Sequence, residues 1–175
     1  DLVRSRGLGD VYKRQLYIPP KKGKQHILRI IRELLVDRPE CMTTNYKIPL
    51  EYINSIISKR SICFIISDFF EPIPDTSLKI LCKRHDVIGI QIQDPIEKKI
   101  AAIGILSVKD LESNKEFLID TNQNEYSNSL EKQSTKMIEA TRLQFSRANA
   151  EFLVIDDLSN YIKSLLRFFK MRQKR

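Results

Sequence analysis

Two spacings of hydrophobic residues alternate along the chain, and together they predict a protein built from both helices and strands. Apolar residues recur at helical spacing in five segments: residues 25–36, the second half of 41–60, 75–84, 125–148 and 158–169. Apolar runs of strand length occupy residues 61–67, 86–93 and 151–155. Strands that alternate with helices in this way indicate an α/β fold, Rossmann-like, with a mostly parallel sheet and helices on both faces.

The strand candidates differ in how buried they are expected to be. Residues 61–67, SICFIIS, form a continuous apolar run, which is typical of a central parallel strand covered on both faces. The second half of DVIGIQIQ, residues 86–93, alternates Ile with Gln, which predicts a less buried face. Residues 100–108 and 116–119 fit the two strands of a β-hairpin. Because this hairpin interrupts the alternation, we expect it at one edge of the sheet.

Length and composition are those of one folded domain with a substantial core. The chain has 175 residues, of which 42% are hydrophobic and 30% are charged. Residues 1–15 lack a regular apolar period, and we expect them to be a non-native or disordered head. We place the domain at residues 16–170 and a basic tail at residues 171–175.

The net charge of +8 is concentrated near the two ends of the chain. Residues 1–15 and 167–175 are rich in Lys and Arg, whereas the charges between them nearly cancel. This distribution does not predict a nucleic-acid interface, which needs basic residues gathered on a folded surface. Phe168 and Phe169, beside the basic C-terminus, are expected to pack inward, so we do not expect contact with a membrane surface.

The cysteines and the missing motifs narrow the class of protein. Three cysteines without paired spacing fit a reducing, cytoplasmic environment, and Cys63 is expected to pack in the core. The sequence has no apolar run long enough for a membrane helix and no signal peptide. It also lacks a phosphate-binding P-loop, a nucleophile elbow and a zinc-protease motif, so the chain is not expected to be an enzyme.

Asp68 is the first candidate for chemistry, because it stands where the apolar run of residues 61–67 ends. In open α/β sheets, ligands bind outside the carboxyl ends of the strands. The competing interpretation is a turn-forming or helix-capping Asp, which is common in such loops. Position alone does not decide between these two interpretations.

Hydroxyl groups before the second helix are the other candidates. Thr44 or Asn45 can cap that helix, in which Pro49 is tolerated only in the first turn. Thr43 and Thr44 become ligand candidates only if their loop reaches the same sheet edge as Asp68. A hydroxyl with a carboxylate suits Mg²⁺, although two ligands are few for an ion that binds about six oxygens. Near the C-terminus, Asp156–Asp157 is expected to cap the last helix.

Five ordered segments carry a resemblance to a known family. They read YIPPKKGKQHILRIIRELL, TTNYKIPLEYIN, ICFIISDFFEP, LCKRHDVIGIQIQDPIEKKI and IGILSVKDLESNKEFLIDT. Together they resemble the C-terminal two-thirds of the bacterial proteins called domain of unknown function 58, over Leu16 to Asp120. The most specific pieces are ISDF and the RHDV…DP pair.

The resemblance implies a von Willebrand factor A-like fold with a metal-ion-dependent adhesion site at the carboxyl edge of its sheet. In such a site, Thr44 matches the loop Thr and Asp68 matches the Asp after a central strand. The third part, an Asp-x-Ser-x-Ser segment, does not occur in this chain. The resemblance thus implies a domain truncated at its N-terminus and lacking its first strands. Mg²⁺ would then bind the complete domain, and weakly or not at all here.

The resemblance also implies what the protein does. We expect a non-enzymatic protein-interaction module whose partner is a MoxR-type AAA+ ATPase, with an acidic side chain of the partner completing the shell of the metal. The alternative is a metal-dependent phosphoryl or ester hydrolase that uses Asp68 as a ligand. That alternative needs further carboxylates near the metal, and the sequence has no Asp-x-Asp pair near Asp68.

Overall fold

The computed structural model describes residues 16–36, 44–94, 104–109, 116–122, 124–157 and 159–173. The chain divides into two compact units, Asp1–Thr44 and Asn45–Arg175. Within the first unit, helix α1 (Lys24–Val36) confirms the helix expected at residues 25–36. The head expected at residues 1–15 lies outside the described residues.

The second unit contains the remaining helices and strands. In chain order they are α2 (Lys47–Ile56), β1 (Ile62–Ser67), α3 (Asp75–Arg84), β2 (Asp86–Ile92), β3 (Ile105–Lys109), β4 (Glu116–Asp120), α5 (Asn124–Arg147), β5 (Glu151–Ile155) and α6 (Tyr161–Arg172). Each helix and strand expected between residues 25 and 169 is present in the described residues, whereas the short strand that LYI at residues 16–18 suggests is not formed. The pattern of apolar residues therefore predicted the elements of an α/β protein correctly.

Three parallel strands form the main sheet, in the order β1-β2-β5. Ile62 of β1 lies opposite Asp86 of β2, and Ile88 of β2 lies opposite Glu151 of β5. Among the described strands β2 is therefore the central one and β1 lies at an edge, so the cover expected on both faces of residues 61–67 is not found in the described part of this chain. The apolar residues Ile62, Phe64 and Ile66 on one face of β1 are 58%, 47% and 64% exposed.

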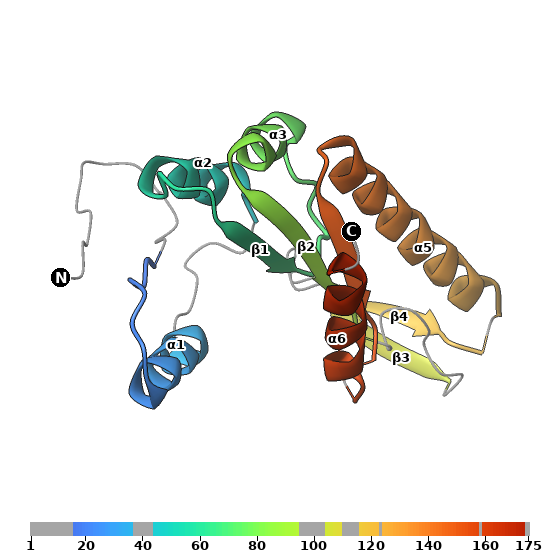
Figure 1. Ribbon diagram of the computed structural model, residues 1–175. Coiled ribbons are helices and arrows are strands. Elements are labelled where there is room, and N and C mark those ends of the chain that lie inside the picture. Colours follow the sequence, from blue (N-terminus) through green and yellow to red (C-terminus); the bar gives the residue numbers. More distant parts are fainter. Residues whose placement is uncertain are drawn as a thin grey trace, which may run out of the picture. The chain divides into compact units, whose positions relative to one another are not determined.

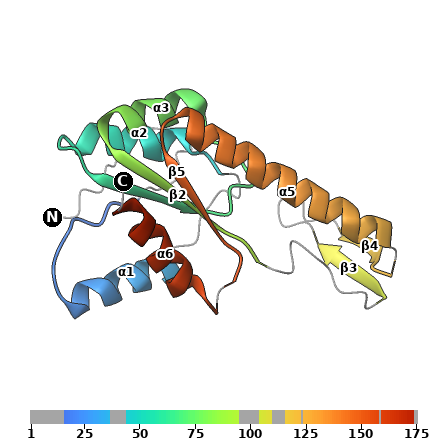
Figure 2. The ribbon, with the colours of Figure 1, turned by 45° about the vertical axis from the view of Figure 1, so that its right-hand side comes forward.

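Helices pack on both faces of this sheet, as expected (Figures 1 and 2). Successive residues of a strand point to opposite faces, so Val87 and Ile88 of β2 enter different cores. The first core contains residues of α2, α3 and α5, including Leu50, Leu78 and Phe145. The second core is formed by Ile88, Ile90 and Ile155, against which Leu165, Phe168 and Phe169 of α6 pack. The expected inward packing of Phe168 and Phe169 is confirmed.

Aromatic rings fill the first core beside the central strand. The ring centroid of Phe145 lies 5.6 Å from that of Phe69 and 5.2 Å from that of Phe152. Phe69 also stacks on Tyr46, with 6.1 Å between the centroids. These rings join α2, the loop after β1, α5 and β5 into one packed unit.

The two cysteines that the structure describes belong to this core as well. Cys63 is buried in the first core and Cys82 packs against it, which confirms the structural role expected for Cys63. Burial raises the pKa of both thiols, that of Cys82 to about 11. Both therefore stay protonated near neutral pH, where a thiol is a weak nucleophile.

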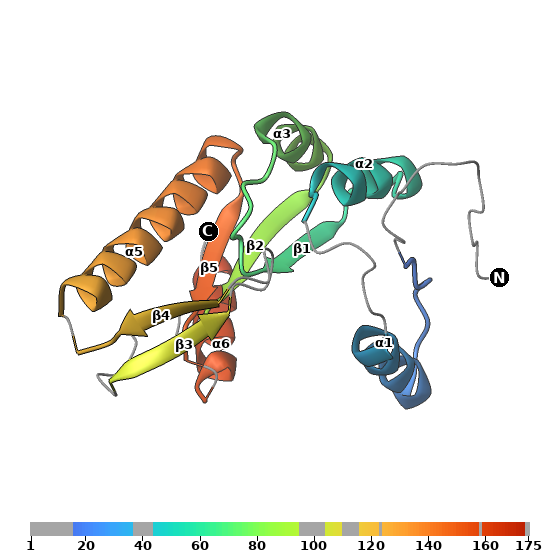
Figure 3. The same cartoon turned by 180° about the vertical axis from the view of Figure 1, so that it is seen from behind.

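Strands β3 and β4 form the expected antiparallel hairpin, with Ile105 opposite Asp120 (Figure 3). The backbone N–H and the hydroxyl of Thr121 both donate to the carbonyl oxygen of Gly104, at 2.9 Å and 2.7 Å. Among the described strands, however, the hairpin is a separate two-stranded sheet rather than an edge of the parallel one.

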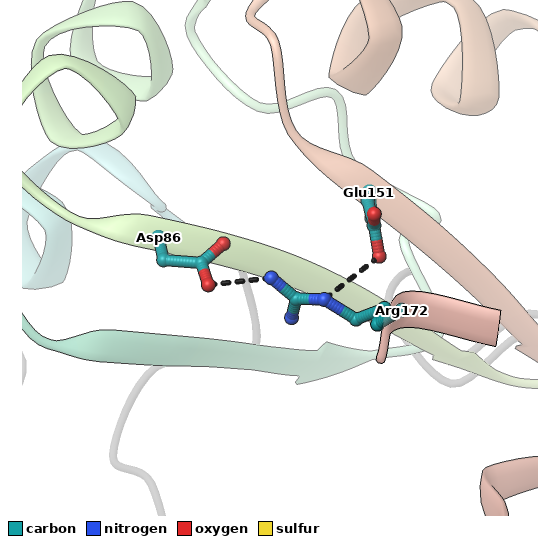
Figure 4. Close-up of polar contacts among 3 residues, drawn as sticks. All are labelled: Asp86, Glu151 and Arg172. Carbon is teal, nitrogen blue, oxygen red and sulfur yellow. Dashed lines mark hydrogen bonds and ion pairs between the residues drawn. The ribbon is translucent and has the colours of Figure 1, made fainter. Parts of the chain in front are cut away.

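Helix α6 is anchored to the sheet at its C-terminal end (Figure 4). The Arg172 guanidinium contacts the Asp86 carboxylate through Nη2, at 2.5 Å, and the Glu151 carboxylate through Nε, at 3.3 Å. Asp86 begins β2 and Glu151 begins β5, so one cation ties the helix to both strands. The helix extends beyond the end expected at residue 169 and includes this cation.

The start of α6 corrects the capping expected of Asp157. The helix begins at Tyr161, after Asn160, and no side chain caps it. Asp157 instead accepts hydrogen bonds in the turn before the helix, from the Ser159 hydroxyl, the Asn160 amide and the Ser159 backbone N–H. These bonds, that from the Ser159 hydroxyl first, lower the pKa of the exposed Asp157 carboxyl to about 2.

Candidate ligand-binding site

Asp68 lies at the carboxyl edge of the parallel sheet. It directly follows Ser67, the last residue of β1, which lies opposite Gln91 near the end of β2. Because the strands are parallel, the loops after them meet at this edge, where α/β proteins bind their ligands. The structure thus places Asp68 where the sequence predicted it.

The loop that carries Asp68 is held in place by a buried ring. Phe69 has a positive φ of 57° and is only 3% exposed, since its ring packs in the first core. Asp68 Oδ1 accepts hydrogen bonds from the Ser67 hydroxyl, at 3.2 Å, and from the Phe70 backbone N–H, at 3.3 Å. Asp68 is therefore a turn-forming residue, as one interpretation predicted, and its carboxylate remains exposed. Its role as a ligand stays a prediction.

Tyr46 is a neighbour of this loop that the sequence did not point to. Its hydroxyl lies 2.6 Å from the Ser67 hydroxyl, and its ring stacks on Phe69. Burial is the main cause of a raised Tyr46 pKa, to which the nearby Asp68 and Glu71 charges add, while the hydrogen bond with Ser67 acts in the opposite direction. The phenol is therefore neutral near neutral pH, and it helps to position Ser67 beside Asp68.

A pocket of about 270 Å³ opens beside Asp68, between the sheet edge and helix α5. It is lined by Asp68, Phe70, Gln91, Gln93, Leu130, Gln133, Ser134 and Met137. Asp68 is the charged residue among these eight. The pocket therefore combines one carboxylate with neutral polar groups and apolar side chains, which is a common composition for a binding site.

Two of the residues that line this pocket, Gln91 and Gln93, are buried. Gln91 is 7% exposed and Gln93 is 5% exposed. Gln91 Nε2 donates to the backbone carbonyl of Asp68, at 2.8 Å, and Gln93 Nε2 donates to the Ser134 hydroxyl, at 2.5 Å. The expectation that this half of the strand has a less buried face is therefore wrong, because α5 covers it.

The side-chain amide oxygens of these two glutamines lack hydrogen-bond donors in the described part of the chain. Within the described part of the chain, neither Gln91 Oε1 nor Gln93 Oε1 accepts a hydrogen bond. A buried acceptor without a donor costs about 1–3 kcal/mol. The pocket therefore contains two buried acceptors that a suitable donor would satisfy.

Thr44, the other predicted ligand, ends the first unit and is exposed. Helix α2 begins at Lys47, and the Asn45 side chain accepts a hydrogen bond from the Lys47 backbone N–H, at 3.0 Å. The N-cap position is Tyr46, without a side-chain cap, so the expectation that Thr44 or Asn45 caps this helix is wrong. Pro49 stands in the first turn as expected. Thr43 lies outside the described residues. The pairing of Thr44 with Asp68 stays a prediction.

The described residues do not form a Mg²⁺ site by themselves. Among them, no group of three or more His, Cys, Asp or Glu side chains could hold a metal ion. Asp68 contributes one carboxylate, and one of its oxygens already accepts two hydrogen bonds. Mg²⁺ needs about six oxygens in a regular octahedron, so its binding would require ligands beyond this set.

The parallel sheet, the helices on both of its faces and the polar pocket define an α/β protein with a candidate ligand site at the carboxyl ends of its strands. Comparison with known families adds a match over residues 7–140 to "Protein of unknown function DUF58". This match covers more than half of the chain, which therefore belongs to that family.

Similar proteins are found in mycobacteria. An uncharacterised protein of Mycobacterium tuberculosis is 27% identical over 108 residues, which are 59% of this chain and 34% of the relative. An uncharacterised protein of Mycobacterium avium is 28% identical over 123 residues, which are 66% of this chain and 69% of the relative. The chain thus spans about a third of the length of the first relative. No solved structure matches it.

The helices in the described part of the chain were also compared with the requirements of a membrane span. None of them is both long enough and apolar enough to cross a bilayer.

Proposed function

We propose that this chain is a non-enzymatic protein-interaction module whose binding centre is Asp68. The observation that supports this proposal is the way the loop after β1 is built. Buried Phe69 fixes the backbone in the core, so the neighbouring carboxylate stands exposed at the mouth of a pocket. A preorganised charged group at a sheet edge binds a partner without first having to be ordered.

The resemblance to von Willebrand factor A-like domains extends this proposal to a metal and a partner. In a complete domain, Thr44, Asp68 and an Asp-x-Ser-x-Ser segment would hold Mg²⁺, and a MoxR-type AAA+ ATPase would supply an acidic side chain to it. The segment does not occur in this chain. The metal is therefore proposed for the complete domain, and weak or no binding is proposed here.

The Asp68→Ala variant tests the proposed binding centre. In a pull-down with the purified MoxR-type ATPase of the same organism, we expect recovery of the ATPase to fall about tenfold or more, because loss of a central charged contact costs at least ~1.4 kcal/mol. Glu139→Ala removes an exposed carboxylate elsewhere on α5 and should leave recovery unchanged. Equal recovery with all three proteins would contradict the proposed role of Asp68.

A metal-dependent phosphoryl or ester hydrolase remains the second candidate, because Asp68 borders a pocket that could admit a small substrate. Such chemistry needs several groups that converge on a metal, and Asp68 is the sole carboxylate among the described pocket residues. A phosphatase and esterase screen with Mg²⁺ separates the candidates. Turnover that disappears in Asp68→Ala would favour the hydrolase.

We further propose that the sheet is part of a larger, von Willebrand factor A-like one that continues beyond β1. β1 pairs with β2 on one side, and among the described strands its other edge is unpaired. The unpaired backbone groups of such an edge favour the addition of a strand. The exposed Ile62, Phe64 and Ile66 on one face of β1 also leave apolar surface for an extension to cover.

Urea unfolding tests this extension. A chain lengthened at its N-terminus by the preceding family segments should unfold at a higher urea concentration and with a steeper slope, because more surface is buried. Equal midpoints and slopes for the two chains would contradict a continuation beside β1.

A further inference from the structure

The pocket beside Asp68 contains hydrogen-bond acceptors that lack a donor in the described part of the chain. Its charged group is the Asp68 carboxylate, and the oxygens Gln91 Oε1 and Gln93 Oε1 are without donors in the described part of the chain. One N–H of each amide is used, by the Asp68 carbonyl and by the Ser134 hydroxyl. An occupant that brings hydrogen-bond donors would therefore satisfy groups that the described residues leave without one.

Reversing the two amide groups does not satisfy both of these oxygens. Reversing Gln91 would place its oxygen against the Asp68 carbonyl, where two acceptors would face each other. Reversing Gln93 is tolerated by Ser134, since a hydroxyl can donate or accept, but it would leave the Gln93 NH₂ without a partner instead. The orientation of Gln91 is therefore fixed by its neighbour, and at least one buried acceptor remains.

The charge of the pocket favours a cation. Although the chain carries a net charge of +8, no Lys or Arg is among the eight described residues that line the pocket. The volume of about 270 Å³ lies just below the ~300–1,000 Å³ typical of small-molecule sites, and suits a single side chain. Phe70, Leu130 and Met137 offer apolar surface to the methylene groups of such a side chain.

We propose that this pocket binds the guanidinium group of an arginine on a partner protein. A guanidinium is planar, always charged, and carries five N–H donors, so it can bind a carboxylate with two of them and donate the others to amide oxygens. Asp68 accepts the bidentate pair, and Gln91 and Gln93 accept the remaining donors. Because an amide group turns as one unit, each enclosed oxygen reaches the ligand only when its NH₂ gives up the bond to the Asp68 carbonyl or to Ser134, and this exchange is part of the proposed binding.

This inference rests on the proposed function as an interaction module, but it needs neither Mg²⁺ nor Thr44. Among the described residues Asp68 belongs to no cluster of metal-binding side chains, yet a single carboxylate is a sufficient partner for one guanidinium.

The test uses N-acetyl-arginine amide as the probe, titrated into the ¹⁵N-labelled chain in the presence of EDTA. We expect the side-chain NH₂ signals of Gln91 and Gln93 to shift in a saturable way. Asp68→Asn should weaken binding about tenfold or more, whereas Glu139→Gln, a matched loss of one exposed carboxylate, should not change it. N-acetyl-lysine amide should bind more weakly, because its ammonium cannot form the planar pair.

Three results of this titration would count against arginine binding in the pocket. Absence of shifts, or equal binding by the wild type and Asp68→Asn, would overturn the inference, and so would equal binding of the lysine and arginine probes. If the arginine probe fails while Asp68→Ala still loses the ATPase, the proposed function stands and this inference does not. If the probe binds but recovery of the ATPase is unaffected, the pocket is confirmed and the proposed partner is not.

Discussion

Replacing Phe145 with alanine is expected to lower the free energy of unfolding by about 3–5 kcal/mol. Phe145 on α5 is fully buried, and its ring contacts those of Phe69 and Phe152 in the first core. The substitution removes a large apolar surface from this core and leaves a cavity that the surrounding rings cannot fill. Urea unfolding followed by circular dichroism measures the change.

Leu143→Ala provides the matched control on the same helix. Leu143 is 50% exposed, so its truncation should change the free energy of unfolding by no more than about 0.5 kcal/mol. A similar loss in both variants would contradict the assignment of Phe145 to the centre of the core.

The second large effect is expected at Gly89, in the middle of the central strand β2. A Cβ atom added there would lie 2.6 Å from Phe145 Cε1 and Cζ and 2.9 Å from Phe152 Cδ2, closer than atoms in contact can approach. We expect Gly89→Ala to destabilise the chain by about 1–3 kcal/mol through overpacking. The higher strand propensity of Ala offsets only about 0.5–1 kcal/mol of this. The same unfolding measurement applies.

The cause of this effect can be checked with a double variant. In a Phe145→Leu background the two closest ring atoms are gone and only Phe152 Cδ2 remains, so Gly89→Ala should cost less, with a coupling of about 0.5–3 kcal/mol between positions 89 and 145. Strictly additive effects would show that the ring of Phe145 is not what excludes a side chain from position 89.

The spacing of apolar residues, and the polar and turn-forming residues between them, predicted the helices and strands because both are local features of the sequence. Helix α3 and strand β5 have the predicted bounds, and each begins or ends at a polar or turn-forming residue. The position of β1 in the sheet could not be predicted in this way. An apolar run shows that a strand prefers burial, but the order of strands depends on segments distant in the chain, and β1 lies at an edge of the described sheet.

The residues of the candidate site could also be predicted only in part. Asp68 was predictable, because a carboxylate after an apolar run marks the end of a strand. Gln91 and Gln93 were not, because polar residues that alternate with Ile suggest a solvent-facing side. Their burial comes from α5, whose Ser134 is 41 residues away from Gln93 and contacts it directly. Sequence alone could have suggested them only through the placement of two Gln residues on the same strand face near its carboxyl end.

If Asp68 is the centre of a protein-binding surface, as proposed, the dissociation constant of the proposed complex with a MoxR-type ATPase depends on its carboxylate. Isothermal titration calorimetry would compare the wild-type chain with Asp68→Asn and Glu139→Gln, two variants that each lose one exposed negative charge. We predict a dissociation constant raised about tenfold or more for Asp68→Asn and unchanged for Glu139→Gln. The same constant for all three chains would contradict the proposed role of Asp68.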